Sequence, residues 1–144
     1  MKVYVCGGSS EMNEVADLMG RLREMGHTIT HDWIATIRAN GEANPRGASH
    51  RQRVRWSAED IAGIEEADVV WVVLPVKPSF GCAFEAGFAL GHGHSMIVSG
   101  DWRASIFTSQ AEARFNEHEH ALEWLKLYGT PGSWDEEMDA LEAV

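Results

Sequence analysis

Residues 69–74 are the sequence feature that most constrains the fold. They read Val-Val-Trp-Val-Val-Leu, an uninterrupted apolar run in which β-branched residues dominate. A strand with one face in water alternates apolar and polar residues, whereas a strand covered on both faces is apolar throughout. The apolar stretch, which extends to Val76, is far shorter than the roughly 20 residues that a membrane-spanning helix requires. We therefore predict a central parallel strand that is covered on both faces by helices.

Strands and helices alternate along the rest of the chain. The first strand runs into the turn Gly7-Gly8-Ser9-Ser10, and apolar residues at helical spacing follow that turn. A capping-box sequence, Ser57-Ala58-Glu59-Asp60, predicts the start of the helix that precedes the central strand. The predicted strands are 2–6, 27–30, 69–74 and 95–98, and the predicted helices are 11–25, 57–66 and 83–91.

This alternation predicts an α/β fold, with a flavodoxin- or Rossmann-like doubly wound parallel sheet and helices on both faces. We expect residues 1–144 to form a single domain. Residues 41–50 read as a loop near the site, and a terminal helix is predicted between Phe115 and Tyr128, ahead of an acidic tail at 134–144. Ligands of such folds bind beyond the carboxyl ends of the strands.

The chain is acidic, since 22 Asp and Glu residues against 12 Lys and Arg give a formal net charge of −10. This charge opposes contact with a phosphate backbone, so we expect no nucleic-acid polymer as a partner. Arg46, Arg51, Arg53 and Arg55 crowd into one polar stretch. That cluster either faces a small anion or forms a solvated loop.

The N-terminus lacks the basic and apolar regions of a signal peptide, so we expect a cytoplasmic protein with no membrane partner. The histidine pairs His92 with His94 and His118 with His120 are spaced for neither one helix face nor a metal motif. We interpret them as surface histidines. No metal and no cofactor is expected.

Three loops, 7–10, 75–82 and 99–102, follow the carboxyl ends of predicted strands, so we expect the fold to bring them together. Glu85 falls in the first turn of the helix after the second loop, where the helix dipole and unpaired N–H groups favour an ionised carboxylate. An ionised carboxylate can act as a nucleophile. Taken alone, Glu85 also suits a structural role in which it merely complements the dipole.

Asp60 and Asp68 stand at the two ends of the helix before the central strand, and the pattern Glu85-Ala86-Gly87-Phe88-Ala89 follows a Gly-containing loop. This order resembles the nucleoside 2-deoxyribosyltransferase superfamily, which includes a branch of 2'-deoxynucleoside 5'-phosphate N-hydrolases. The resemblance covers most of residues 1–100 and extends to Tyr4, to the Gly7-Gly8-Ser9 turn and to residues 26–33.

The resemblance implies cleavage of an N-glycosidic bond by a retaining displacement. Glu85 attacks the anomeric carbon, the base departs, and water or a second base resolves the glycosyl-enzyme. Asp60 matches the general acid/base carboxylate of the family, and Tyr4 matches a tyrosine that orients the nucleophile. From the residues alone, Asp60 also suits a capping acid in the Ser57 box, and Tyr4 also suits a core residue of the first strand.

The same resemblance indicates how a substrate would be held. Ser9 and Ser79, with the backbone N–H groups of Gly7 and Gly8, stand where helix N-termini can bind a 5'-phosphate or 5'-hydroxyl. The sequence Pro-Ser-x-Gly that ends at Gly81 is similar to the N-hydrolase branch and favours a nucleotide. The chain nevertheless lacks the arginine that this branch places near the phosphate, after Gly8.

Of the tryptophans, Trp33 is the one that we predict to stack on the base, although tryptophan is more often a core residue. The expected partner is a small-molecule nucleoside or nucleotide. Family members assemble as homodimers or larger homo-oligomers in which a neighbour completes the pocket, and the resemblance implies the same here. Three alternatives stay open: base transfer instead of hydrolysis, hydrolysis of another N-glycoside, and a non-catalytic nucleotide-binding sensor on the same fold.

Overall fold

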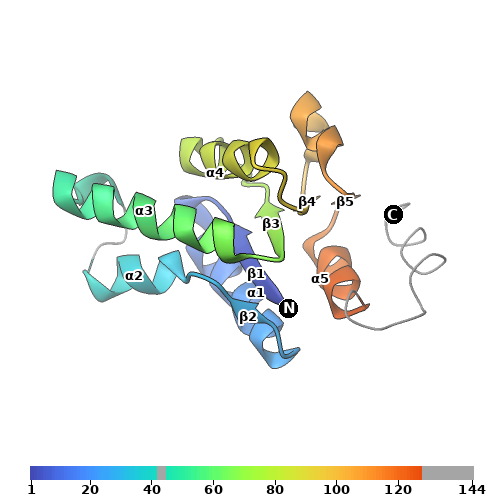
Figure 1. Ribbon diagram of the computed structural model, residues 1–144, viewed down its shortest axis with the longest axis horizontal. Coiled ribbons are helices and arrows are strands. Elements are labelled where there is room, and N and C mark those ends of the chain that lie inside the picture. Colours follow the sequence, from blue (N-terminus) through green and yellow to red (C-terminus); the bar gives the residue numbers. More distant parts are fainter. Residues whose placement is uncertain (42–44, 128–144) are drawn as a thin grey trace.

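A computed structural model gives the structure of residues 1–41 and 45–127 (Figure 1). Tyr128, the acidic tail at 134–144 and part of the predicted loop lie outside these residues. Within the described ranges, no helix combines the length and the apolar composition needed to cross a membrane. The strands are β1 Lys2–Cys6, β2 Thr28–Ile29, β3 Val69–Val73, β4 Met96–Ser99 and β5 Ala113–Phe115. The α-helices are α1 Met12–Glu24, α2 Trp33–Ala39, α3 His50–Glu66, α4 Phe80–Gly91 and α5 His118–Leu127, and short 3-10 helices cover Ser9–Glu11, Pro45–Gly47, Trp102–Ala104 and Ile106–Gln110.

The five strands form one parallel sheet in the order β2-β1-β3-β4-β5. β3 lies at its centre and is buried along its whole length, as the apolar run predicts. Helices α3 and α4 cover one face of the sheet, while α1 and α5 lie together on the other (Figure 1). The predicted doubly wound α/β fold is therefore confirmed.

The strand order places the crevice of the fold beside β1. From β1 the chain first moves outward to β2 and then crosses back to β3 on the other side of β1. The loops after β1 and β3 consequently leave the sheet in opposite directions and open a space between them. This topological switch point is where a ligand is expected in such a fold.

Helix α3 begins at His50, earlier than predicted. Its N-cap is Ser49, whose hydroxyl accepts from the Gln52 N–H at 3.2 Å while the Gln52 side chain accepts from the Ser49 N–H at 2.9 Å. Ser57 lies inside the helix, where its hydroxyl donates to the Val54 carbonyl at 3.0 Å. The predicted capping box at Ser57 is therefore wrong, because a stronger reciprocal cap precedes it.

Phe115 belongs to β5 rather than to the terminal helix, which starts at His118. The strand spans only 3 residues, which is too short for a period in the apolar pattern to reveal it. β5 pairs in parallel with β4 and completes the edge of the sheet.

A buried hydrogen-bond chain joins β3, β4 and α5. Trp71 Nε1 donates to Ser99 Oγ at 2.9 Å, and Ser99 Oγ lies 2.7 Å from His118 Nδ1. Since Trp71 occupies a lone pair of Ser99, the hydroxyl hydrogen is free to donate to His118. His118 is thus part of an internal network, and its interpretation as a surface histidine is wrong.

We expect Ser99→Ala to lower the free energy of unfolding by about 1–3 kcal/mol, because it leaves the buried Trp71 N–H and the Nδ1 atom of His118 without their hydrogen-bond partner. Urea denaturation at constant pH measures this change. Ser109→Ala is the matched control, since Ser109 is exposed, and we expect it to stay within about 0.5 kcal/mol of wild type. Equal effects of the two substitutions would contradict the role of the buried chain.

Candidate active site

A cavity of about 370 Å³ lies at the carboxyl edge of β1 and β3, between α2, α3 and the first turns of α4. This volume falls within the roughly 300–1,000 Å³ that small-molecule sites occupy. The cavity therefore coincides with the switch point of the sheet. Its lining residues are Gly7, Ser9, His31, Trp33, Thr36, Ile37, Arg53, Trp56, Ser57, Asp60, Ser79, Gly81, Cys82 and Glu85.

Most of the predicted site residues meet in this cavity, and Tyr4 lies fully buried beside its two carboxyl groups. Residues far apart in the sequence have thus been brought to one place by the fold. The predicted residues that line the cavity are Gly7, Ser9, Trp33, Asp60, Ser79, Gly81 and Glu85.

Gly8 and the loop at 99–102 do not line the cavity. A Cβ atom at Gly8 would lie 2.8 Å from Pro75 Cβ, so this glycine lets the loops after β1 and β3 pack closely. Gly100 and Asp101 instead line a second cavity of about 660 Å³ against another face of α4. The second loop borders both cavities through Ser79, so it meets each of the other two loops. The first and third loops line different cavities, and the predicted convergence of all three on one site is therefore wrong for the third.

Glu85 lies in the second turn of α4, not in the first. The helix begins at Phe80, since the Ser79 hydroxyl caps it by accepting from the Cys82 N–H at 3.2 Å. Burial, and then the negative charge of Asp60, raise the pKa of Glu85 to about 8. The expectation that the helix start favours an ionised Glu85 is therefore wrong, because desolvation outweighs a dipole whose effect fades after the first turn.

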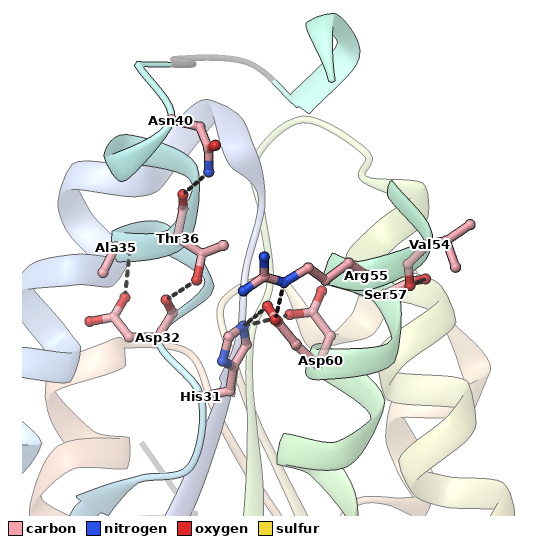
Figure 2. A network of polar contacts seen from close by, with 10 residues as sticks. His31, Asp32, Ala35, Thr36, Asn40, Val54, Arg55, Ser57 and Asp60 are labelled. Atoms are coloured by element: carbon pink, nitrogen blue, oxygen red, sulfur yellow. Dashed lines mark hydrogen bonds and ion pairs between the residues drawn. The ribbon is translucent and has the colours of Figure 1, made fainter. Parts of the chain in front are cut away.

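Asp60 lies inside α3 and faces the same cavity, so its interpretation as a capping acid is also wrong. Burial raises the pKa of the Asp60 carboxyl, and His31 opposes this rise. The Asp60 Oδ1 atom lies 3.4 Å from His31 Nε2, and Figure 2 shows the imidazole pointing at that carboxyl across the space between α2 and α3. The two carboxyl groups of the cavity thus have different neighbours.

Tyr4 stays protonated beside both carboxyl groups. Its burial, and then the charges of Glu85 and Asp60, raise the pKa of the phenol far above its ordinary value. Its hydroxyl has no hydrogen-bond partner within the described part of the chain. Interactions with the Cys6 thiol and the Tyr4 hydroxyl act against the rise of the Glu85 pKa. Tyr4 is thus a core residue that also presents an unused donor to the carboxyl pair.

His31 and Gly63 are site residues that the sequence patterns did not single out. A Cβ atom on Gly63 would lie 2.8 Å from the His31 Cβ and 2.9 Å from Tyr4 Cδ2. The bare backbone of α3 therefore admits both side chains one turn after Asp60. Two signals were available: His31 directly follows a predicted strand, and Gly63 shares a helix face with Asp60.

One arginine, Arg53, and two tryptophans, Trp33 and Trp56, also line the cavity. Arg53 is held by its Nε and Nη2 groups, which donate to the carbonyls of Ala48 at 3.2 Å and Arg46 at 2.7 Å. Trp33 Nε1 donates to the Val5 carbonyl at 2.9 Å, and Trp56 lines the cavity from α3. Among the described residues, no group of His, Cys, Asp and Glu is arranged to hold a metal ion.

No protein-family model matches the sequence, and no curated protein matches it significantly. The structure of a 2-deoxyribosyltransferase from the psychrotolerant bacterium Bacillus psychrosaccharolyticus is similar, with a TM-score of 0.67 and 17% identity over 98% of this chain and 96% of that chain. The structure of a CMP N-glycosidase from Clostridium botulinum is also similar, with a TM-score of 0.57 and 18% identity over 89% of this chain and 99% of that chain. At such low identity these likenesses establish the fold.

We expect Glu85→Gln to stabilise the protein at pH 9 and to have much less effect at pH 5. The Glu85 pKa rises from an ordinary 4.5 to about 8 on folding, so wild type loses stability as pH rises through this window. The neutral amide removes that loss, which we place on the order of 3 kcal/mol. Urea denaturation at the two pH values measures the difference.

Glu65→Gln is the control for this substitution, because Glu65 is an exposed carboxyl on α3. We expect it to change the free energy of unfolding by less than about 0.5 kcal/mol at both pH values. A Glu85→Gln protein that is equally destabilised at pH 5 and pH 9 would contradict the buried, proton-holding state of Glu85.

Proposed function

We propose that this protein is an enzyme of the nucleoside 2-deoxyribosyltransferase superfamily that cleaves the N-glycosidic bond of a (deoxy)nucleoside or of its 5'-monophosphate. The observation that carries the proposal is the pair of carboxyl groups, Glu85 and Asp60, which face one small cavity at the switch point of the sheet. A non-catalytic binding module has no need to place two carboxyl groups together in a poorly hydrated site, where burial makes both harder to ionise and Asp60 makes Glu85 harder still.

In the proposed first step, a Glu85 carboxylate oxygen attacks the anomeric carbon. The bond from that carbon to the base nitrogen breaks, and the departing base takes its electron pair together with a proton from Asp60. In the second step, water or another base gives a proton to Asp60 and displaces the Glu85 carboxylate. Both steps need two carboxyl groups with different protonation states, which the different neighbours of Glu85 and Asp60 support.

The lining of the cavity offers groups for both parts of a nucleoside. Ser9 and Ser79 lie near the ends of the strands, beside Gly7 and Gly81, where hydroxyl and N–H groups suit a 5'-hydroxyl or 5'-phosphate. Trp33 also lines the cavity, with its ring close to Gly7, and suits a flat base. This arrangement supports a nucleotide or nucleoside as substrate.

Arg53 supports the monophosphate form of the proposal. It lines the cavity, and two of its donors are committed to backbone carbonyls, which leaves Nη1 to meet an anionic ligand. In the predicted arginine cluster, Arg55 is engaged elsewhere, since it pairs with Glu59 at 2.8 Å. Arg53 is thus the residue that we propose in place of the arginine missing after Gly8.

The structural neighbours support the same class of reaction. One is named a 2-deoxyribosyltransferase and the other a CMP N-glycosidase, and the second name specifies both an N-glycoside and a nucleotide. The shared fold places the loops after β1 and β3 at a common edge in this chain, which is where the carboxyl pair lies.

To test the function, the protein is incubated at pH 8 with deoxynucleosides, ribonucleosides and their 5'-monophosphates, with and without a second free base, and base release is followed by chromatography. We expect Glu85→Ala to lose about 10³-fold or more of the rate, because the nucleophile is absent. Asp60→Asn should lose about 10²-fold or more where the base needs a proton to leave. Exchanged nucleoside identifies a transferase, and free base identifies a hydrolase.

Glu65→Gln serves again as the control and should keep the wild-type rate. Turnover that survives Glu85→Ala would overturn the covalent mechanism. A wild-type protein that binds nucleotides but is inert across the whole panel would overturn the enzyme and favour a sensor.

We also propose that the protein forms a homo-oligomer through the outer face of α4. Phe80 is 88% exposed and Phe84 is 77% exposed, one turn apart on the helix that carries Glu85. With Phe88 they border a shallow apolar hollow. Large aromatic side chains grouped on one exposed face favour a partner surface, and a second copy of the same chain offers a matching one.

Phe84→Glu should convert the oligomer to monomer, because it places a charge in the apolar contact. Size-exclusion chromatography with light scattering measures the mass. Phe107→Glu is the matched control, since Phe107 is 69% exposed but lies in the segment after β4, and it should keep the wild-type mass. A monomeric wild type would contradict this assembly.

A further inference from the structure

The His31 side chain lies between two consecutive carboxyl groups of α3. Its Nε2 atom is 3.4 Å from Asp60 Oδ1 and 4.0 Å from Glu59 Oε2. Figure 2 shows the imidazole beside the Asp60 side chain. The His31 side chain is 19% exposed and that of Asp60 is 22% exposed, so water screens this contact poorly. The Glu59 carboxylate is itself paired with Arg55 at 2.8 Å.

The carboxyl neighbours determine which nitrogen of His31 carries a hydrogen. An ionised carboxylate only accepts hydrogen bonds, so an Nε2 lone pair would face two acceptors. Where both carboxylates are ionised, Nε2 is therefore a donor, whether the ring is neutral or charged. Nε2 and Asp60 Oδ1 are both buried, and neither has a hydrogen-bond partner among residues 1–41 and 45–127. Their contact at 3.4 Å is therefore an ion pair and not a hydrogen bond of good geometry.

Contacts of its two chain neighbours and of helix α3 fix the backbone and the Cβ atom of His31. Thr30, its neighbour in the chain, donates its N–H to the Val3 carbonyl at 3.0 Å, and Asp32 caps α2 by accepting from the Ala35 N–H at 2.9 Å. Against α3, the His31 Cβ occupies the space left open at Gly63. The imidazole is therefore held in place before any substrate arrives.

We propose that His31 is a positioning residue for Asp60, and that its Nε2–H holds the Asp60 carboxylate in the cavity and stabilises its negative charge while the site is empty. The catalytic role of His31 rests on the proposed function, whereas its contact with Asp60 is independent of that function. Because His31 faces Asp60 and not Glu85, it makes the two carboxyl groups unequal.

His31 also affects which carboxyl group, Glu85 or Asp60, holds the proton that the pair shares. Burial raises the pKa of Glu85 to about 8 and also raises that of Asp60, but only Asp60 has His31 to oppose the rise. The directions of the two pKa shifts favour Glu85 as the holder of the proton when no substrate is bound. The proposed displacement needs the reverse, with Glu85 ionised and Asp60 protonated. Since the two carboxyl groups are coupled, the proposed displacement requires the proton to move from Glu85 to Asp60 when substrate binds.

Any pH effect at His31 involves every charged or titratable group that faces it. The charge of His31 also lowers the pKa of Asp32. The N-cap bond from the Ala35 N–H and the pair with Arg23 at 2.8 Å lower this pKa more than His31 does. The groups around the imidazole are Glu59 and Asp60 of α3, Tyr4 of β1, Asp32 of its own segment, and, one contact further away, Arg55, Arg23 and Glu85.

The test follows the Asp60 and Glu85 side-chain carboxyl carbons by NMR in the full-length, substrate-free protein as pH is varied. In His31→Leu, which keeps bulk but removes the donor, the Asp60 titration should move up by about one pH unit. In His31→Gln, whose amide can donate from a similar place, it should stay within about 0.3 units. His50→Leu is the matched control, because His50 is an exposed histidine on the first turn of α3.

A kinetic measurement accompanies the titration if the wild type turns over a substrate of the panel. His31→Leu should lower kcat about 10- to 100-fold, leave KM within about 3-fold and shift the pH dependence of kcat, because Asp60 is held less well. His31→Gln should recover kcat to within about 5-fold of wild type. A merely structural role would not give this recovery together with the shifted pH profile.

A folded His31→Leu protein with the wild-type Asp60 titration would overturn the proposal, and so would a His31→Gln protein as impaired as His31→Leu. If His31→Leu does not fold, His31→Asn replaces it, since its amide is too short to reach Asp60. The titration needs no substrate. A protein that is inert across the panel but shows the His31-dependent shift would therefore overturn the proposed function alone.

Discussion

The interaction on which the site depends is the mutual effect of two carboxyl groups, Glu85 and Asp60, buried in one cavity. Desolvation opposes ionisation of both groups, and the charge of Asp60 adds to it at Glu85, so the pair retains a proton at a pH where isolated carboxyls have lost theirs. Burying such a pair opposes folding, so the surrounding chain must hold the two groups in place. Catalytic carboxyl groups with separate roles need the shifted pKa values that this burial gives, so a buried pair points to function.

The parallel sheet and the helices on it hold the two carboxyl groups in place. β1 pairs with β3 from Val3 to Cys6 and delivers Tyr4 and the glycine turn to the edge of the site, while α3 and α4 pack side by side on one face. Asp60 and Glu85 therefore approach each other from two adjacent helices, not from flexible loops. Gly63 completes the arrangement, because the absence of its side chain lets the Tyr4 ring and His31 lie against α3.

The fold class could be predicted from the sequence, because an uninterrupted apolar run and alternating periods are local signals of burial. The resemblance carried by Asp60 and Glu85 likewise pointed to residues that the fold brings together. Helix starts were predicted less well: the Ser49 cap was overlooked in favour of Ser57, and Ser79 begins α4 before the predicted start at residue 83. Each of these errors moved a carboxyl group to a wrong place within its helix and so to a wrong electrostatic environment.

By itself, the sequence determined the strand at 69–74, the doubly wound architecture and the identity of the two carboxyl groups, because patterning and motifs are written in neighbouring residues. Only the tertiary structure decided that burial raises the pKa of Glu85 to about 8, that His31 faces Asp60, and that the loop at 99–102 belongs to another cavity. These properties depend on desolvation and on distances of a few ångströms between segments far apart in the chain. They exist only once the sheet has brought those segments together.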